Sequence, residues 1–289
     1  MKHLADGFRY SFSKLAAFLQ CPMSFYLQYV EGTNDDEELP GYFSQYGTLM
    51  HSILEQYYKD ELPVFCLADE WRDRYDSEVT ITPPPFPAGF GEKNYNAAVD
   101  YLENFEGLPD GYRVLSVERK FVINIGGYNV SGIADLVMDD GTMHDGHSGI
   151  IIVDHKTKSM NSMKKEYQLY RKQLYLYAIW CKQEYGFYPK TLRFNMVKEN
   201  VNIDEPFDEN MVEVTKQWFI DTIHEIETCD ALEAWETCIA DGERKEPYFC
   251  RWICGVNPAC TRYQEVRNIA YGEYLAKKAA EEEMMNGCI

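Results

Sequence analysis

Two short apolar runs on either side of a polar, glycine-rich segment constrain the fold of this chain more than any other feature. The runs are residues 132–138 (GIADLVM) and 150–157 (IIIVDHKT), and the segment between them is dense in Asp and Gly. Runs of this length that are rich in Ile and Val and separated by turn residues are typical of two buried strands in a β-hairpin. The sequence therefore predicts a β-sheet that contains this hairpin.

The register of the hairpin predicts which of its polar residues lie together. In an antiparallel pair the numbers of facing residues sum to a constant, so a turn centred on His144 and Asp145 places Asp135 opposite Asp154. Cross-strand neighbours of this kind lie about 5 Å apart. Asp154 and Lys156 are two residues apart on one strand and therefore share a face of the sheet. We thus expect two carboxylates and an ammonium group together at the end of a buried hairpin.

This group of charges needs compensation. Two neighbouring buried carboxylates repel each other, and the loss of solvent adds to the cost unless a cation or a proton is present. A hard divalent ion such as Mg²⁺ binds carboxylate oxygens and leaves positions open for water and phosphate. A nearby lysine can orient the attacking water or stabilise charge on a phosphoryl group. The alternative is a hairpin with acidic residues at its frayed ends, and the spacing alone leaves both interpretations open.

A second hairpin is expected immediately before the first. Residues 114–138 predict two strands joined at Gly126 and Gly127, a strong signal for a tight turn. With the following strand they form a three-stranded meander. Glu118 alternates with buried positions and could point toward the same face as Asp135.

The rest of the chain adds helices and one more strand. Residues 166–185 predict a helix and residues 191–198 a strand, so the pattern indicates an α/β fold with a mixed central β-sheet flanked by helices. The proline-rich residues 82–90 cannot be helical, and we interpret them as part of a connector. Other helices are predicted at 11–30 with an interruption at Cys21-Pro22, from Gly47 or Thr48 to Tyr58, at 67–75, 94–105 and 209–227, around 231–240, and at 263–285.

Composition limits the class of protein. The chain has 289 residues, of which 45% are hydrophobic and 26% charged, as in ordinary globular proteins. No apolar run has the length of a transmembrane helix and the first residues lack a signal-peptide core, so we expect no membrane association and a cytoplasmic location, in a bacterium or in the host cell of a phage. Nine cysteines without a secretory signal favour thiols or metal ligands over disulfides.

The distribution of charge indicates where nucleic acid could bind. A net charge of −19 counts against a general polyanion binder. A basic segment with Glu166 as its single acid nevertheless follows directly on the strand that ends at Lys156. The negative charge of the rest of the chain would discourage non-specific binding of DNA and could favour a protein partner that delivers the substrate. Besides Lys156, the basic segment contains Lys158, Lys164, Lys165, Arg171 and Lys172.

Three cysteines lie close together near the C-terminus. Cys250, Cys254 and Cys260 fall within a loop that also contains aromatic residues, glycine and proline. Cysteine thiolates in a bent loop suit zinc or an iron–sulfur cluster. No fourth ligand lies in the loop itself, and the candidates for it are Cys229, Cys238, Cys288 and the distant Cys21.

The motifs in this order resemble the RecB-like branch of the PD-(D/E)XK nuclease superfamily, to which CRISPR-associated RecB-like exonucleases and the AddB nuclease domain belong. The resemblance covers residues 11–263 but leaves the region around 60–110 unmatched. Each motif alone is weak, and their order and spacing together are fairly specific. The motifs are SFSKLAAFLQCP near the N-terminus, GTLMH ending in His51, GIAD ending in Asp135, DHKT from Asp154, QLYLY from Gln173 to Tyr177, and the terminal cysteines.

The resemblance implies a role for each motif. It implies that His51, Asp135 and Asp154 bind Mg²⁺ or Mn²⁺ and that Lys156 is the catalytic lysine. Glu118 matches an acidic residue that the family often has upstream. Two further residues, Gln173 and Tyr177, would support the site or contact DNA.

The resemblance also implies a [4Fe–4S] cluster held by Cys21, Cys250, Cys254 and Cys260, which would staple the two ends of the chain together. The spacing departs from the family at one point. Three residues separate Cys250 from Cys254, where the family usually has two, while the gap of five before Cys260 matches. Zinc is the lesser alternative at these cysteines.

These observations predict a metal-dependent DNA nuclease, a phosphodiesterase that acts as an exonuclease on single strands or duplex ends, in recombination, repair, CRISPR adaptation or phage replication. One alternative is a catalytically silent DNA-binding or assembly subunit, against which the intact acids and lysine argue. An iron–sulfur redox sensor ranks last. The expected parts of a single nuclease domain, 1–289, are N-terminal helices at 1–60, an insertion or connector at 61–110, a catalytic core at 111–200, and a helical region with the cysteines at 201–289 that closes on the N-terminus.

Overall fold

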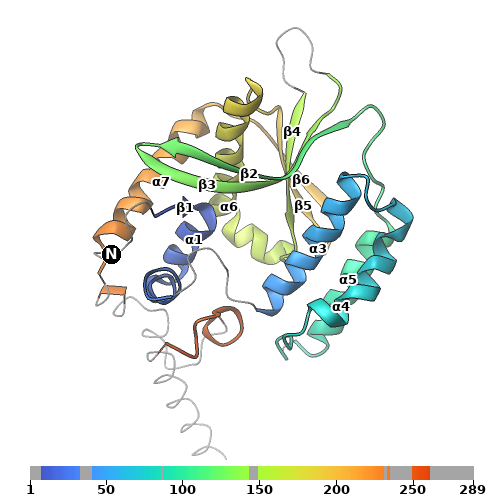
Figure 1. The fold of residues 1–289 in the computed structure, drawn as a ribbon, viewed down its shortest axis with the longest axis horizontal. Helices are drawn as coiled ribbons and strands as arrows, with labels where there is room; N and C mark the ends of the chain where they lie inside the picture. The colour runs from blue at the N-terminus through green and yellow to red at the C-terminus, as the bar shows by residue number, and fades with distance from the viewer. Residues whose placement is uncertain are drawn as a thin grey trace, which may run out of the picture. The chain divides into compact units, whose positions relative to one another are not determined.

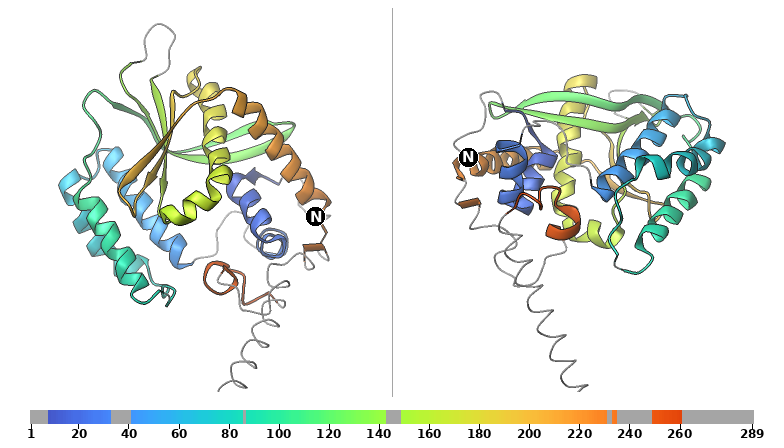
Figure 2. Two further views of the ribbon diagram at one scale, coloured as in Figure 1. Left: turned by 180° about the vertical axis from the view of Figure 1, so that it is seen from behind. Right: turned by 60° about the horizontal axis from the view of Figure 1, so that its bottom comes forward.

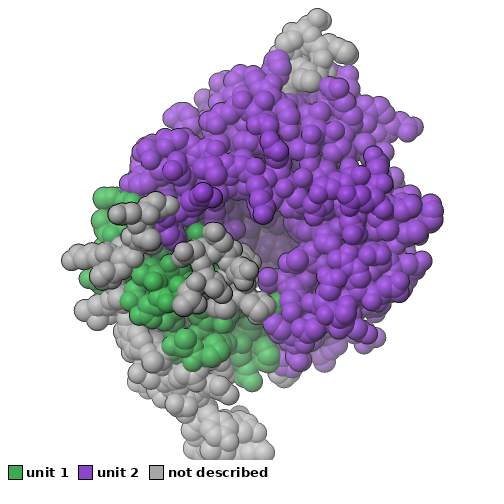
Figure 3. Space-filling model, in the orientation of Figure 1, with its two compact units in different colours: residues 1–6, 14–41, 224–289 green, residues 7–13, 42–223 purple. Residues whose placement is uncertain are grey.

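The computed structural model describes residues 8–32, 41–85, 87–142, 149–230, 233–234 and 249–260. The chain divides into two compact units, which Figure 3 shows in different colours. Unit 1 comprises Met1–Asp6, Lys14–Gly41 and His224–Ile289, and unit 2 comprises Gly7–Ser13 and Tyr42–Ile223. The division into the four expected parts of one nuclease domain stays a prediction.

Unit 2 is built on a mixed β-sheet flanked by helices, which confirms the predicted α/β class (Figure 1). The strand order is β1-β3-β4-β5-β6, and β2 pairs with β3 off this path. The β1–β3 and β4–β5 pairs are parallel, and the other pairs are antiparallel. The sequence did not predict β1 or β6. The strands are β1 (Tyr10–Ser11), β2 (Arg113–Ile125), β3 (Tyr128–Asp139), β4 (Ile150–Lys156), β5 (Thr191–Met196) and β6 (Val201–Pro206).

The β3–β4 hairpin has the register expected from the sequence. Leu136 pairs with Val153, and the ladder continues in step to Asp139 and Ile150. These pairs have the same sum of residue numbers as a turn centred on positions 144 and 145, although those positions lie outside the described residues. The next step of this register brings Asp135 and Asp154 opposite each other.

The β2–β3 hairpin turns at the two glycines, as predicted. Ile125 pairs with Tyr128, and Gly126 and Gly127 have φ angles of +58° and +94°. This left-handed backbone at both turn positions is what a tight hairpin requires and what glycine adopts without steric cost. The Gly127 amide also donates to Asn124 Oδ1 over 3.1 Å.

The long helix α6 (Met160–Tyr185) packs against the sheet, with contacts to β2, β3, β4 and β5 (Figures 1 and 2). It begins before the predicted residue 166 because Ser159 caps it: the Ser159 side chain accepts a hydrogen bond from the Ser162 amide over 3.3 Å. It ends at Gly186, whose φ of +81° is a common helix stop.

Three other helices of unit 2 lie side by side: α3 (Tyr42–Tyr58), α4 (Leu67–Glu78) and α5 (Phe90–Glu103). They share a core that includes Tyr46, Leu49 and Trp71. The segment interpreted as a connector thus contains two helices packed with α3. Helix α3 begins at Tyr42, ahead of the predicted Gly47 or Thr48, because Tyr42 and Tyr46 are buried in this core.

The described part of unit 1 contains the predicted break at Cys21-Pro22. Helix α1 (Phe12–Gln20) ends before it, and α2 (Pro22–Phe25) begins with proline at its first position and continues into the π-helix η1 (Tyr26–Val30).

Helix α7 (Asn210–Thr228) confirms the helix predicted at 209–227. The predicted helix at 263–285, and most of the one around 231–240, lie outside the described residues. None of the helices in the described ranges is both long and apolar enough to cross a membrane.

Candidate active site

The alternation of side chains along β4 places its two charged residues on one face of the sheet, which they share with Ile150 and Ile152. Ile151 and Val153 belong to a cluster that packs against Tyr58. Asp154 and Lys156 have the opposite parity and face α6. Asp154 is 1% exposed and Asp135 is 7% exposed, so both candidate metal-binding acids are desolvated.

Lys156 is held by groups from β4 and α6. Its Nζ lies 2.6 Å from Asp154 Oδ2 and donates to Gln173 Oε1 over 2.8 Å. Burial lowers the pKa of Lys156, but Asp154, Tyr170 and Asp135 together outweigh burial and raise it, so the ammonium stays charged. Gln173 in turn donates to the Tyr177 hydroxyl over 2.7 Å, and the Tyr170 ring lies 4.7 Å from the ammonium. The structure thus brings together the predicted Asp154, Lys156, Gln173 and Tyr177.

His51 on α3 faces the acids with one specific nitrogen. Its Nε2 lies 3.0 Å from the His155 carbonyl oxygen, which can only accept, so Nε2 carries a proton. Nδ1 then faces Glu118 Oε1 at 3.2 Å and Asp135 Oδ2 at 3.7 Å. Burial lowers the pKa of His51, but the carboxylates of Asp135 and Glu118 outweigh burial and raise it.

Glu118 reaches this group through an unusual backbone. The pairs on either side, Val117 with Leu136 and Arg119 with Ala134, place it opposite Asp135. Its φ is +46°, a left-handed conformation that costs a side-chain-bearing residue about 1–3 kcal/mol. A strained residue beside two buried acids is typical of a functional site.

The donor atoms present fit a hard divalent ion. Ligand atoms of His51, Glu118 and Asp135 all lie within 4.8 Å of one another. Buried Asp154 Oδ2 lies 2.6 Å from the Lys156 ammonium but has no hydrogen bond from any described group. Carboxylate oxygens with one imidazole nitrogen are suitable ligands for Mg²⁺ or Mn²⁺. The three residues whose ligand atoms lie closest together therefore include Glu118, whereas the sequence predicted Asp154 as the third ligand.

His155 is a residue that sequence reasoning missed. Its backbone amide donates to Asp135 Oδ2 over 2.8 Å, and its carbonyl accepts from His51. Its ring is buried between Tyr58, which stacks on it, and Asn195, which lies 2.9 Å from Nδ1. Burial lowers the pKa of His155 to about 3, so the ring is neutral. The available signal was a polar residue on the core-facing side of β4.

The predicted DNA-binding residues fall into two groups. Lys164 and Lys165 are exposed on α6. The other three are engaged within the chain: Lys158 with Glu166 and the Tyr170 ring, Arg171 with Glu205, and Lys172 with the Gln168 carbonyl oxygen and the Trp218 ring. Their contact with DNA stays a prediction.

The four cysteines assigned to one cluster come together in unit 1. Burial raises the pKa of Cys250 to about 12, and the nearby thiols of Cys254, Cys21 and Cys260 add to this effect. Ser24, three residues after Cys21, lies 3.5 Å from Cys254 Sγ. The loop that carries the C-terminal thiols includes η3 (Phe249–Ile253) and is braced by Asn257, whose side chain donates to the Cys250 carbonyl oxygen over 2.8 Å.

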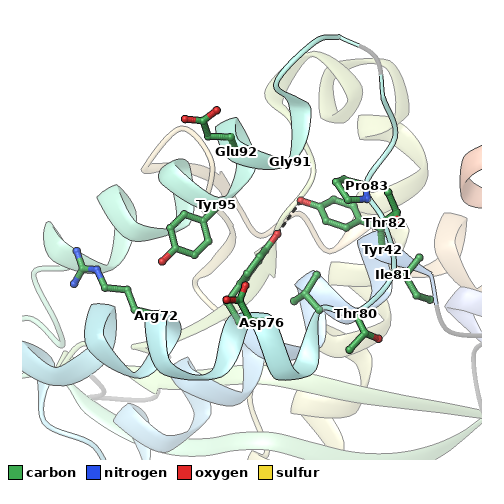
Figure 4. Close-up of a pocket in the computed structure, with 12 residues that line it drawn as sticks. Tyr42, Arg72, Asp76, Thr80, Ile81, Thr82, Pro83, Gly91, Glu92 and Tyr95 are labelled. Atoms are coloured by element: carbon green, nitrogen blue, oxygen red, sulfur yellow. Dashed lines mark hydrogen bonds between the residues drawn. The ribbon is translucent and has the colours of Figure 1, made fainter.

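A cavity of about 550 Å³ lies elsewhere in unit 2, over α4, α5 and the loop between them (Figure 4). The hydroxyls of Tyr42 and Tyr75 approach each other there at 3.5 Å. None of the predicted site residues lines it, and its exposed carboxylates, Asp76 and Glu92, are poorly suited to binding a polyanion.

A mixed sheet with paired acids and a lysine at the end of one hairpin defines a candidate phosphodiesterase site. The family model of the PD-(D/E)XK nuclease superfamily matches residues 9–261. The chain belongs to this superfamily, whose members use divalent metals, and membership implies a metal-dependent nuclease.

Other comparisons add little. One of the solved structures that match is described as "Crystal structure of SSO0001". It is 16% identical in sequence over 86% of this chain and 92% of that chain, with a TM-score of 0.29, too low to carry an argument. No curated protein matches this chain.

Proposed function

We propose that this protein is an exonuclease of the RecB-like branch, which hydrolyses phosphodiester bonds in DNA at single strands or duplex ends. The observation that carries the proposal is the convergence of three acids, one imidazole and one charged lysine around the end of β4. A binding module has no need of paired buried acids held beside an ammonium, because they repel phosphate unless a cation is present.

Each residue of the candidate site would have a distinct role in hydrolysis. Asp135, Asp154 and Nδ1 of His51 would hold Mg²⁺ or Mn²⁺, with Glu118 as a further ligand. When bound, such an ion supplies Lewis-acid polarisation of the phosphate and a more acidic bound water. Lys156, fixed by Asp154 and Gln173, would hold the attacking water or stabilise charge on the phosphoryl oxygens.

We also propose that Cys21, Cys250, Cys254 and Cys260 hold a structural [4Fe–4S] cluster. Four thiols that lie near one another in unit 1 support this proposal. Zinc at the same four thiols is the lesser alternative.

The proposed substrate is DNA, met during recombination, repair, CRISPR adaptation or phage replication. The excess of acidic residues, 47 against 28 Lys and Arg, supports a protein partner that delivers the substrate. Lys164 and Lys165 are exposed on α6, the helix that also carries Gln173 and Tyr177, and we propose that they contact the DNA backbone.

The test is cleavage of end-labelled single-stranded and duplex DNA with Mg²⁺ or Mn²⁺, by protein purified without oxygen. Lys156→Ala should abolish cleavage. Lys190→Ala should leave cleavage unchanged, because Lys190, which immediately precedes β5, is exposed and pairs with Asp140. The product ladder gives the polarity and separates exonuclease from endonuclease action. Folded wild-type protein that binds DNA but cuts nothing with either metal would contradict the proposal and favour an assembly subunit.

A further inference from the structure

Lys198 is a half-buried lysine beside the candidate site that the proposed chemistry does not use. It lies in the turn between β5 and β6, where Met196 pairs with Val201. The parallel register places Met196 beside Lys156, and the Val197 amide donates to the Lys156 carbonyl oxygen over 3.0 Å. Lys198 therefore follows the strand end next to the candidate catalytic lysine.

Aromatic rings hold the Lys198 ammonium in place. Its Nζ lies 5.4 Å from the centroid of the Tyr46 ring and 5.7 Å from that of the Phe90 ring, within the range of cation–π contacts. The Tyr46 ring is itself fixed by a hydrogen bond of 2.9 Å from its hydroxyl to the Asn94 carbonyl oxygen. Tyr46 lies on α3, the helix that also carries His51.

Cations on the neighbouring strands form ion pairs with carboxylates, whereas Lys198 forms none with the described residues. Lys156 pairs with Asp154, and Arg193 on β5 pairs with Asp204 through two contacts. Within the part of the chain that the structure describes, no carboxylate comes within 4.0 Å of Lys198 Nζ. Among the described residues, the carboxylate that interacts with this ammonium is that of Glu199, at more than ion-pair distance.

Its surroundings favour the arrival of an anion. Burial lowers the pKa of Lys198 to about 8, and Glu199 opposes this effect only in part. The Glu199 carboxylate accepts a hydrogen bond of 2.8 Å from the Met160 amide at the start of α6. A bound anion would offset the cost of burying the ammonium group, which the aromatic rings offset only in part.

We propose that Lys198 binds a backbone phosphate of the nucleic acid next to the phosphate that is cleaved, with Tyr46 and Phe90 as positioning residues. The inference rests on the proposed nuclease function, which supplies a chain of phosphates at the adjacent strand end. A contact of this kind positions the strand and reads no sequence.

The salt dependence of DNA binding tests the inference. Binding of a labelled single-stranded oligonucleotide by the full chain is measured by fluorescence anisotropy at several salt concentrations, with Ca²⁺ in place of Mg²⁺. Lys198→Met keeps the aliphatic stem on the rings but removes the charge, and Lys198→Arg keeps a charge. Lys216→Met removes a charge from α7, where Lys216 pairs with Glu213.

One phosphate contact contributes about 0.7 to the slope of log K against log salt for single strands. We expect Lys198→Met to reduce the magnitude of this negative slope by about this amount and to weaken DNA binding severalfold. Lys198→Arg and Lys216→Met should bind like the wild type. A slope for Lys198→Met equal to that of Lys216→Met overturns the inference, even if its melting temperature falls, because Lys198 is then structural. Wild-type protein that neither binds nor cleaves DNA overturns the inference together with the proposed function.

Discussion

The two candidate ligand sites of this chain differ in how far along the sequence their residues lie from one another. In unit 2, Glu118, Asp135 and Asp154 come from β2, β3 and β4, which follow one another through hairpins. In unit 1, Cys21 lies beside a loop that begins more than two hundred residues later. Hairpin register brings the acids of the first site together, whereas the second site requires closure of a long chain segment, which costs conformational entropy.

This difference suggests different roles for the ligands. The acids of unit 2 lie on strands that pair through backbone hydrogen bonds, so an ion there should matter more for chemistry than for folding. The cysteines of unit 1 lie on or near two short helical segments far apart in sequence, so a cluster that joins them should matter mainly for stability. Single substitutions at the two sites can test this separation.

Asp154→Asn should have the largest effect, on activity. Loss of one carboxylate should lower metal-dependent cleavage by about a thousandfold, the upper end of what removing one electrostatic group does. The melting temperature should change little, because relief of the repulsion with Asp135 offsets the loss of the ion pair with Lys156. Asp76→Asn, at an exposed position on α4, is the matched control and should cleave normally. Unchanged cleavage by Asp154→Asn would remove Asp154 from the site.

Cys250→Ser should mainly affect stability. It should eliminate the visible absorbance of an iron–sulfur cluster and lower the melting temperature by about 5 °C or more, which corresponds to about 2 kcal/mol in a chain of this size. Cys181→Ser is the matched control, a buried cysteine of unit 2 that donates to the Phe187 carbonyl oxygen. An equal loss of absorbance in both variants, or in neither, would contradict the assignment of Cys250.

Gln173→Ala should reduce cleavage less than Asp154→Asn does. It removes the hydrogen bond to the Lys156 ammonium, and such bonds to charged groups are worth about 1.5–3 kcal/mol, so cleavage should fall about 10- to 100-fold. Tyr177→Phe removes the hydrogen bond between Gln173 and the Tyr177 hydroxyl, one step further from Lys156. A neutral hydrogen bond of this kind is worth about 0.5–1.5 kcal/mol, so cleavage should fall tenfold or less. Equal losses in the two variants would mean that Gln173 does not act through Lys156.

Glu118→Gly should have the smallest effect, on stability. Glycine relieves the left-handed strain, so this variant should be about 1 kcal/mol more stable than Glu118→Gln, which keeps the strain and removes the charge. Chemical denaturation of the two variants measures the difference. Both should lose activity. A more stable Gln variant would show that the backbone at this position is not strained.

The sequence predicted the parts of the fold that depend on local pattern. Alternation and turn residues were enough for the β3–β4 register and for the shared face of Asp154 and Lys156. They were not enough for Glu118, whose unusual φ angle brings it to His51, because such a conformation has no signature in a glutamate. The role of His155 is carried by its backbone, which sequence does not display.

Tertiary packing decided what local pattern did not. Helices α4 and α5 were predicted, but their shared core with α3 depends on contacts such as Tyr46 with Trp71. The early start of α3 follows from the same core. The cysteine cluster illustrates the limit most clearly, since spacing left its fourth ligand open and the resemblance was needed to choose Cys21.

The most direct test of the central claim is anomalous diffraction from crystals soaked in Mn²⁺, with anaerobic protein and data collected at the manganese edge. The account predicts an anomalous peak within coordination distance of Asp135 and Asp154, with Nδ1 of His51 turned toward it. The peak should be absent in Asp135→Asn crystals treated in the same way. A fully soaked wild-type crystal with no manganese at these residues would contradict the account.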